Sequence, residues 1–391
     1  MSIFNSLGSN YDFRSALQTL FQRKDFSAKL TTLLEKEYNG KAVLVYKGRE
    51  AILLSLQLLQ MPKGTQVAIN GFTCFAVYNA VTNAGYSPVL LDIEKTLLHF
   101  SAEILEKAIK QFPSLKVVII QNTLGIACDI EKIAAVCTKH NLILIEDLAH
   151  SVGLYYANRK EAGTIGDFVT LSFSQDKMID AVSGGALVIR NKTYHTLPHV
   201  PFKKVPSSQQ LKDRWYPFLT YCIRKSYDLR IGKLLHSFLR QLSVLSQPVG
   251  NPTDTIHALP RWYCKPIYHG FQSLAQNINH RKAVAGVYEQ IDKKSIGKRE
   301  IKSIFLRFPF FVDNRSSLIS YLKKHHVYIA DIWYDSPISP KQYIQYTNYH
   351  GECPNAENIA KTIINLPTHR NVNARDARVI TERITTWLQS A

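Results

Sequence analysis

The sequence lacks any run approaching the roughly 20 consecutive apolar residues that a membrane-spanning helix requires. Its six cysteines form no CxxC pair and no paired metal spacing, which favours buried free thiols over a metal site or a disulfide framework. The first residues, MSIFNSLGSN, lack the basic-then-apolar pattern of a secretory signal. These absences together predict a cytoplasmic protein.

Acidic residues are scarce, with 30 Asp and Glu against 48 Lys and Arg, and the formal net charge is +18. Such an excess favours acidic partners: nucleic acid, an anionic membrane surface or phosphorylated small molecules. However, the basic residues are spread along the chain, without zinc-finger spacing, an arginine-rich arm or an RNP-like aromatic motif. We therefore expect no nucleic-acid partner.

The composition is that of a globular protein, with 46% hydrophobic and 20% charged residues in 391. Short apolar runs alternate with helical periods between residues 41 and 191. The predicted strands are Val43–Tyr46, Gln66–Ile69, Ser87–Ile93, Lys116–Ile120, Leu142–Asp147, Phe168–Phe173 and Ala186–Ile189. The predicted helices are Arg49–Gln60, Thr73–Ala84, Ala102–Gln111 and Asp129–His140. This alternation predicts an α/β fold with a large, mostly parallel sheet covered by helices on both faces.

The alternation of strands and helices ends after residue 192, and this change predicts two domains. Residues 1–258 would hold N-terminal helices and the large α/β domain, including a basic helical insert at about 195–258, and residues 259–391 a smaller α+β domain. From Lys203 to Lys265 there are eleven Lys and Arg against three Asp and Glu. Two interpretations of the insert stay open. In the first, the insert is an amphipathic, basic hairpin with a binding role, which touches an anionic membrane or caps a large phosphorylated substrate. In the second, the hairpin packs on its own domain or on a dimer partner.

Three strand ends carry residues suited to one cofactor. One strand ends at Asp147, another supplies Ser172 just before Lys177, and a third runs directly into a helix at Gly48. Ligands of parallel sheets bind beyond the carboxyl ends of the strands. An amine, a carboxylate and a strand–Gly–helix junction that presents free N–H groups are what pyridoxal 5'-phosphate (PLP) needs. The sequence therefore predicts a PLP site.

Several motifs then resemble a known family in order and spacing. IEDLAHSVG resembles E-D-x-A-Q-x-x-G, and GTIGDFVTLSFSQDKMIDAVSGGALV resembles the stretch around a cofactor lysine. CPNAENIAKTIINLPTHRNV resembles P-x-A-E…L-P-x-H. The chain thus resembles the DegT–StrS type sugar aminotransferases, which are fold-type-I PLP-dependent enzymes, from about residue 26 to the C-terminus except near 195–258.

The resemblance implies roles for individual residues. Lys177 would form the Schiff base with PLP and then move the proton between substrate and cofactor. Asp147 would pair with the protonated pyridine nitrogen. Ser172 would hydrogen-bond the phosphate, and the backbone amides of Gly48 and Arg49 would hold the same group.

Three positions depart from the family pattern near the cofactor. Arg49 replaces the usual Thr of the Ser-Gly-Thr junction. His150 stands where the family has Gln beside the cofactor's 3'-oxygen, which an imidazole can also bind. Cys74 occupies the place of an aromatic residue that stacks on the ring. Two alternatives stay open: neighbouring Phe75 substitutes for it, or the ring rests on smaller groups.

A fourth departure bears on assembly. Arg261 matches the arginine of an Asn-x-Arg-Met segment that reaches the phosphate in a neighbouring subunit, whereas Leu259 replaces the Asn. The resemblance implies a homodimer that transfers an amino group, with glutamate as the donor, to a nucleotide-linked keto-sugar in polysaccharide biosynthesis. Two alternatives stay open: a PLP-dependent sugar dehydratase or isomerase, and an inactive family member acting as regulator or scaffold. Dehydratases of this type replace the lysine with His, so Lys177 favours transamination.

Overall fold

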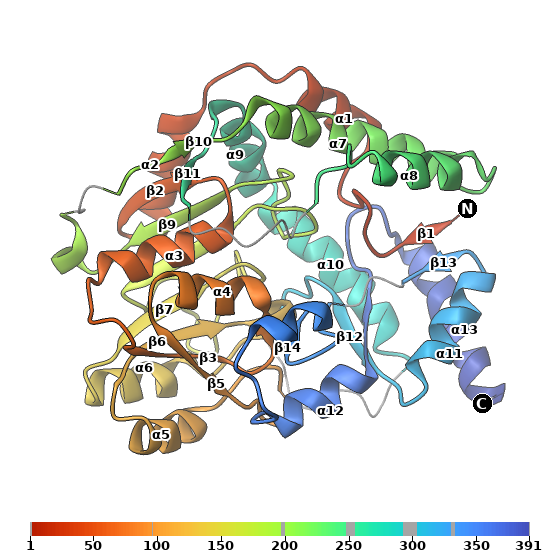
Figure 1. Cartoon of the computed structure of the whole chain (residues 1–391). Helices are drawn as coiled ribbons and strands as arrows, with labels where there is room; N and C mark the ends of the chain where they lie inside the picture. The colour runs from red at the N-terminus through yellow and green to blue at the C-terminus, as the bar shows by residue number, and fades with distance from the viewer. Residues whose placement is uncertain are drawn as a thin grey trace.

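The computed structural model describes residues 2–95, 97–196, 200–247, 255–291, 303–329 and 333–390. A large sheet with helices on both sides forms one part of the molecule, and a smaller α+β part carries the C-terminus (Figure 1). This arrangement confirms the predicted fold class. No described helix is long and apolar enough to cross a membrane.

The large sheet has nine strands in the order β10-β11-β2-β9-β8-β7-β6-β3-β5. The bounds are β2 (Lys41–Val45), β3 (Gln66–Asn70), β5 (Ser87–Leu91), β6 (Leu115–Gln121), β7 (Ile143–Asp147), β8 (Phe168–Ser172), β9 (Gly185–Ile189), β10 (Lys203–Lys204) and β11 (His257–Ala258). Every pairing from β5 to β8 is parallel. Strand β9 runs antiparallel to both β8 and β2, so β2 points the same way as β8. The sequence predicts a mostly parallel sheet and does not predict the antiparallel direction of β9.

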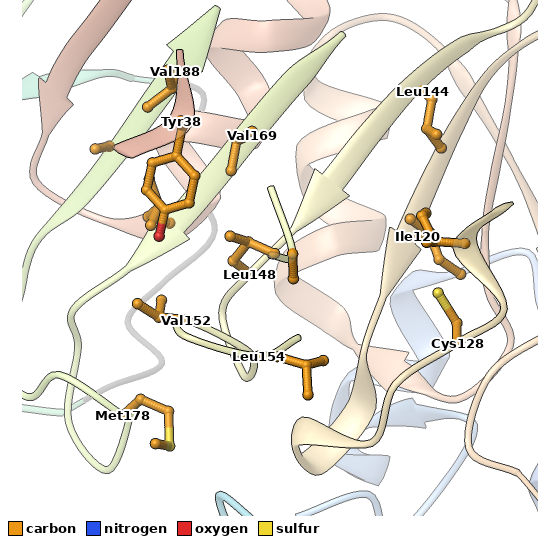
Figure 2. Close-up of a cluster of buried hydrophobic side chains, with 14 of the residues drawn as sticks. Tyr38, Ile120, Cys128, Leu144, Leu148, Val152, Leu154, Val169, Met178 and Val188 are labelled. Carbon is orange, nitrogen blue, oxygen red and sulfur yellow. The ribbon is translucent and has the colours of Figure 1, made fainter. Parts of the chain in front are cut away.

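Both faces of this sheet are buried, as the apolar strands predict. Neighbouring strand residues face opposite sides, so Val117 and Ile119 of β6 pack in one core and Val118 and Ile120 in another. The first core lies under α3 (Gly48–Leu58) and α4 (Phe75–Asn83). The second lies under α2 (Ser27–Tyr38), α5 (Ala102–Gln111), α6 (Ile130–Lys139) and α9 (Cys264–Gln272), and Figure 2 shows part of it around Tyr38.

The smaller part is built around an antiparallel pair, β12 (Phe308–Phe311) and β15 (Ile363–Leu366). Its helices are α10 (Leu274–Tyr288), α11 (Arg315–Lys324), α12 (Pro354–Thr362) and α13 (Ala374–Ser390). Short strands join it to other parts of the chain: β14 (Ile338–Ser339) pairs with β4 (Thr73–Cys74), and β13 (Val327–Tyr328) pairs with β1 (Ile3–Phe4). The predicted boundary near residue 258 stays a prediction. Short 3-10 helices lie at Thr123–Gly125, Lys192–Tyr194, Arg261–Tyr263 and Lys341–Tyr346.

The insert forms a helical hairpin, α7 (Ser207–Lys225) and α8 (Ile231–Gln241), with α7 beside α1 (Phe13–Leu20) (Figure 1). Asp213 anchors α7: its buried carboxylate accepts hydrogen bonds from the hydroxyls of Tyr46 (2.7 Å) and Tyr263 (2.6 Å) and from the amide of Gln209 (2.8 Å). The insert therefore packs on its own chain. One side of α8 is apolar and open to solvent, and its residues are Ile231, Leu234, Phe238 and Leu242, 56–72% exposed.

A second buried carboxylate, Glu146 of β7, closes the loop before β8. Its Oε1 accepts from the N–H groups of Ile165 (2.8 Å) and Gly166 (2.6 Å). Its Oε2 accepts from the N–H of Gly163 (2.8 Å) and the hydroxyl of Tyr156 (2.9 Å). Four donors thus satisfy a carboxylate with no exposed surface.

We expect Glu146→Ala to lower the free energy of unfolding by about 2 kcal/mol or more, because each buried donor left without an acceptor costs about 1–3 kcal/mol. Urea denaturation of the purified protein measures this change. The matched control is Glu382→Ala, at an exposed position of α13, which should change stability by less than about 0.5 kcal/mol. Equal effects of the two substitutions would contradict the role given to Glu146.

Candidate active site

One pocket of about 810 Å³ combines residues of the strand ends, the N-terminus, the insert and the smaller part of the chain. Most of the residues singled out from the sequence line it: Gly48, Arg49, Cys74, Asp147, His150, Ser172 and Lys177. They come from four separate segments, so the fold brings them together as the strand-end rule predicts. Phe75 and Arg261 are not among the lining residues.

Lys177 lies in the loop between β8 and β9, and its Nζ is 4.9 Å from the ring centre of Trp333. Burial lowers the pKa of Lys177, and the nearby charge of Arg307 acts in the same direction, partly offset by Asp147. A lowered pKa leaves more of the amine neutral near pH 7, and the neutral amine is the nucleophile. The environment of Lys177 therefore suits covalent chemistry.

Asp147 ends β7 and is 4% exposed. Its carboxylate accepts from the N–H of Ala149 (3.0 Å) and from the hydroxyl of Thr170 (3.3 Å). Burial raises the pKa of Asp147, and the N–H of Ala149 and the charge of Lys177 oppose that rise. A cationic ring nitrogen beside this carboxylate would favour its ionised form.

His150 is buried and stacks on Trp333, with ring centres 5.2 Å apart and planes at 21°. Its Nδ1 accepts the N–H of Leu124 at 3.2 Å. Burial, together with the charges of Lys177 and Arg307, puts the pKa of His150 well below its usual range. The ring is therefore neutral with its proton on Nε2, and it can donate a hydrogen bond to an oxygen acceptor, as expected for the cofactor's 3'-oxygen.

The candidate phosphate cradle lies where α3 begins. A Cβ on Gly48 would come within 2.6 Å of the Cβ of Ser172, so a side chain there would fill the space beside the serine. A Cβ on Gly185 would lie 2.6 Å from the carbonyl oxygen of Lys47. The first N–H groups of a helix have no acceptor within it, and its positive end attracts anions. Gly48, Arg49 and Ser172 thus fit a phosphate group.

Cys74 lines the pocket and Phe75 does not, which favours the alternative that the cofactor ring rests on smaller groups. Phe75 is 4% exposed and stacks on Tyr343, with ring centres 4.9 Å apart and planes at 7°. The reason is its position: Phe75 is the first residue of α4, and its ring packs in the core beneath that helix.

Arg261 also lies outside the pocket. Its side chain is 82% exposed and its Nε is 3.3 Å from a carboxylate oxygen of Asp25. A contribution to a neighbouring subunit therefore stays a prediction.

Several pocket residues carried no recognisable signal in the sequence. Lys47 donates to the hydroxyl of Ser183 at 2.7 Å, and burial lowers its pKa to about 8. Gln121 donates to the hydroxyl of Tyr334 at 2.8 Å. Arg307 does not line the pocket, but it lies 4.3 Å from the ring centre of the lining residue Trp333. Lys47 could have been noticed as the residue before Gly48. Trp333 and Tyr334 come from the smaller part of the chain, where no local pattern marks them.

The geometry can now be compared with known proteins. A family model described as the DegT/DnrJ/EryC1/StrS aminotransferase family matches residues 18–201 and 267–385. The chain belongs to this family. The family, the fold class and the enzyme class expected from the sequence are thereby confirmed. Residues 202–266, which include α7 and α8, lie outside the match.

Two curated relatives illustrate the range of the family. The pleiotropic regulatory protein of Geobacillus stearothermophilus is 24% identical over 346 residues, covering 86% of this chain and 82% of that protein. GDP-perosamine synthase of Vibrio cholerae is 35% identical over 147 residues, covering 38% of this chain and 39% of that protein.

Solved structures share the whole fold. A sugar aminotransferase of Streptococcus pneumoniae in its PLP form superposes with a TM-score of 0.74 at 18% identity, covering 100% of this chain and 99% of that one. PseC of Helicobacter pylori, an aminotransferase of pseudoaminic acid biosynthesis, gives 0.73 at 17% identity and covers 100% of both chains. At these identities the likeness shows the fold.

The lowered pKa of Lys47 leads to a prediction about anion binding. Lys47 is a cation below about pH 8 and neutral above it, and a bound phosphate group favours the cation. Binding of pyridoxamine 5'-phosphate should therefore weaken by about tenfold between about pH 7 and pH 9. Isothermal calorimetry measures this dissociation constant.

Lys47→Met should flatten that pH dependence, whereas Lys63→Met, at an exposed position, should leave it as in the natural protein. The same pH dependence in Lys47→Met would show that another group controls binding.

Proposed function

We propose that this protein is a PLP-dependent aminotransferase that transfers an amino group from an amino-acid donor, glutamate by family resemblance, to a nucleotide-linked keto-sugar through a Schiff base on Lys177. One observation carries the proposal: an amine of lowered pKa and a buried carboxylate, Lys177 and Asp147, line the same pocket from different strand ends. PLP, when bound, supplies an electron sink for the substrate's carbon–hydrogen bond.

The residues of the chain divide the remaining work. Lys177 attacks as the neutral amine and, once displaced, holds and moves the proton at the reacting carbon. The carboxylate of Asp147 keeps the proton on the pyridine nitrogen. The Nε2–H of His150 would donate a hydrogen bond to the cofactor's 3'-oxygen, and Gly48, Arg49 and Ser172 would hold the phosphate.

The pocket also supports the size and charge class of the substrate. A volume of about 810 Å³ is near the upper end of ordinary ligand pockets, about 300–1,000 Å³. Basic residues dominate its charged lining, which suits a substrate that carries a diphosphate. The curated relatives include GDP-perosamine synthases, whose name points to a nucleotide-linked product.

A regulatory role is the second candidate, because the relative that matches 86% of the chain is a pleiotropic regulatory protein. A sugar dehydratase or isomerase is a third candidate that uses the same cofactor. An absorption spectrum separates the regulator from the enzymes. A visible band with PLP that borohydride abolishes supports a Schiff base, and a colourless protein after PLP addition supports the regulator. Mass spectrometry of products from nucleotide keto-sugars and glutamate separates amino transfer from dehydration.

Lys177→Ala should abolish amino transfer, because it removes the amine that the proposed mechanism uses both to attack and to move the proton. Asp147→Asn should keep the fold yet lower kcat by several orders of magnitude, because the ring nitrogen loses its proton. Single-turnover kinetics and circular dichroism measure the two effects. Full turnover by Lys177→Ala, or a loss under tenfold in Asp147→Asn, about 1.4 kcal/mol, would refute the proposed roles.

We also infer a homodimer in which Arg261 reaches the partner's phosphate site, for which a guanidinium is suited because it binds two oxygens at once. Its exposure of 82% leaves the side chain accessible to a second copy. If Arg261→Ala is inactive, mixing it with inactive Lys177→Ala should restore partial activity through mixed dimers. A monomer by light scattering, or no rescue from proven mixed dimers, would contradict the inference.

The cytoplasmic location, the absence of a nucleic-acid partner and a peripheral contact of the insert with anionic membranes stay predictions. Sedimentation with vesicles of phosphatidylglycerol tests the last one.

A further inference from the structure

The insert forms part of the pocket wall, although it lies outside the family match. Helix α8 contributes His236 and Arg240 to the lining, and the segment after it contributes Leu245, Ser246 and Gln247. The basic side of α8 therefore faces the pocket, while its apolar side faces solvent. Substrate contacts made by α8 belong to this chain and do not follow from family membership.

The opposite wall is α11, which contributes Ile319 and Lys323. Aromatic contacts hold the two walls in place. The ring of Tyr227, between α7 and α8, meets Phe4 at 4.8 Å and Tyr328 at 4.9 Å between ring centres. The Nζ of Lys233 lies 5.3 Å from the ring centre of Tyr227 and 5.8 Å from that of Tyr328. The insert and the smaller part of the chain thus frame one opening.

The basic side chains at this end of the pocket, Arg240 and Lys323, have no carboxylate partner among the described residues. The acidic residues of the lining, Asp147 and Asp176, belong to the segments that carry the catalytic groups. Partial burial lowers the pKa of His236, and the charge of Arg240 lowers it further. This end of the pocket is therefore best suited to bind an anion.

We propose that Arg240 and Lys323, with His236 as a hydrogen-bond partner, bind the diphosphate of the nucleotide-linked substrate. This inference rests on the proposed function and deepens it. The pocket then has two anion sites: the N-terminus of α3 for the cofactor's phosphate, and the α8–α11 opening for the substrate. Arg240 can bind two phosphate oxygens through its fork, and Lys323 acts as a point charge.

The experiment uses the PLP-loaded protein and four probes: UDP, GDP, CDP and dTDP, titrated by isothermal calorimetry. At least one should bind, and Arg240→Ala and Lys323→Ala should each weaken it by about tenfold or more, equal to about 1.4 kcal/mol. The visible absorption band and the single-turnover rate with glutamate should stay as in the natural protein, since both depend on the other end of the pocket.

The matched control is Lys225→Ala, which removes the same charge from the same insert at an exposed position outside the pocket lining. It should bind the probe unchanged. Arg240→Lys should recover part of the affinity, because it restores the charge without the fork.

Three results would overturn the inference. None of the four probes binds, although the band and the glutamate reaction are present. Lys225→Ala weakens the probe as much as Arg240→Ala does. Arg240→Ala slows the glutamate reaction and leaves the probe unaffected, which would assign this end to the donor's carboxylate. Failure of the proposed function is distinct, because the band itself would then be missing from the natural protein.

Discussion

The geometry of the pocket depends on one buried carboxylate, that of Glu146. Its four donors tie the end of β7 to the loop that leads into β8. Neighbouring strand residues face opposite sides of a sheet, so with Glu146 held on one side, Asp147 must face the other, where the pocket lies. The same loop sets the start of β8, which delivers Ser172 and then Lys177. Asp147 and Lys177 are therefore positioned by a residue that does not line the pocket.

A second buried carboxylate, that of Asp213, holds the insert in place. Asp213 joins α7 to Tyr46 at the end of β2 and to Tyr263 before α9. Charge buried without partners is costly, but three hydrogen-bond donors compensate it here. Because Tyr46 directly precedes Lys47 and Gly48, the anchor of the insert and the cradle of the phosphate share one stretch of backbone. Displacing α7 would disturb both.

Much of the fold and half of the site follow from local patterns. The strand runs and the positions of Asp147, Ser172, Lys177 and Gly48 each depend on a few neighbouring residues. The antiparallel direction of β9 does not follow from a local pattern, because an apolar run such as GALVI gives no indication of strand direction. Trp333 and Arg240 reach the pocket only through packing between distant segments. Phe75 is a different case. Cys74 lines the pocket, but the next residue, Phe75, begins α4 and its ring points into the core.

The first strand of the chain has a practical consequence. Residues of β1 pair with β13, the N–H of Asn5 reaches the carbonyl of Tyr328 at 3.0 Å, and Phe4, Ser6 and Leu7 line the pocket. A tag attached next to β1 would therefore lie close to this pocket. The C-terminal helix α13 contributes no residue to that lining, so a handle for immobilisation or labelling belongs at that end.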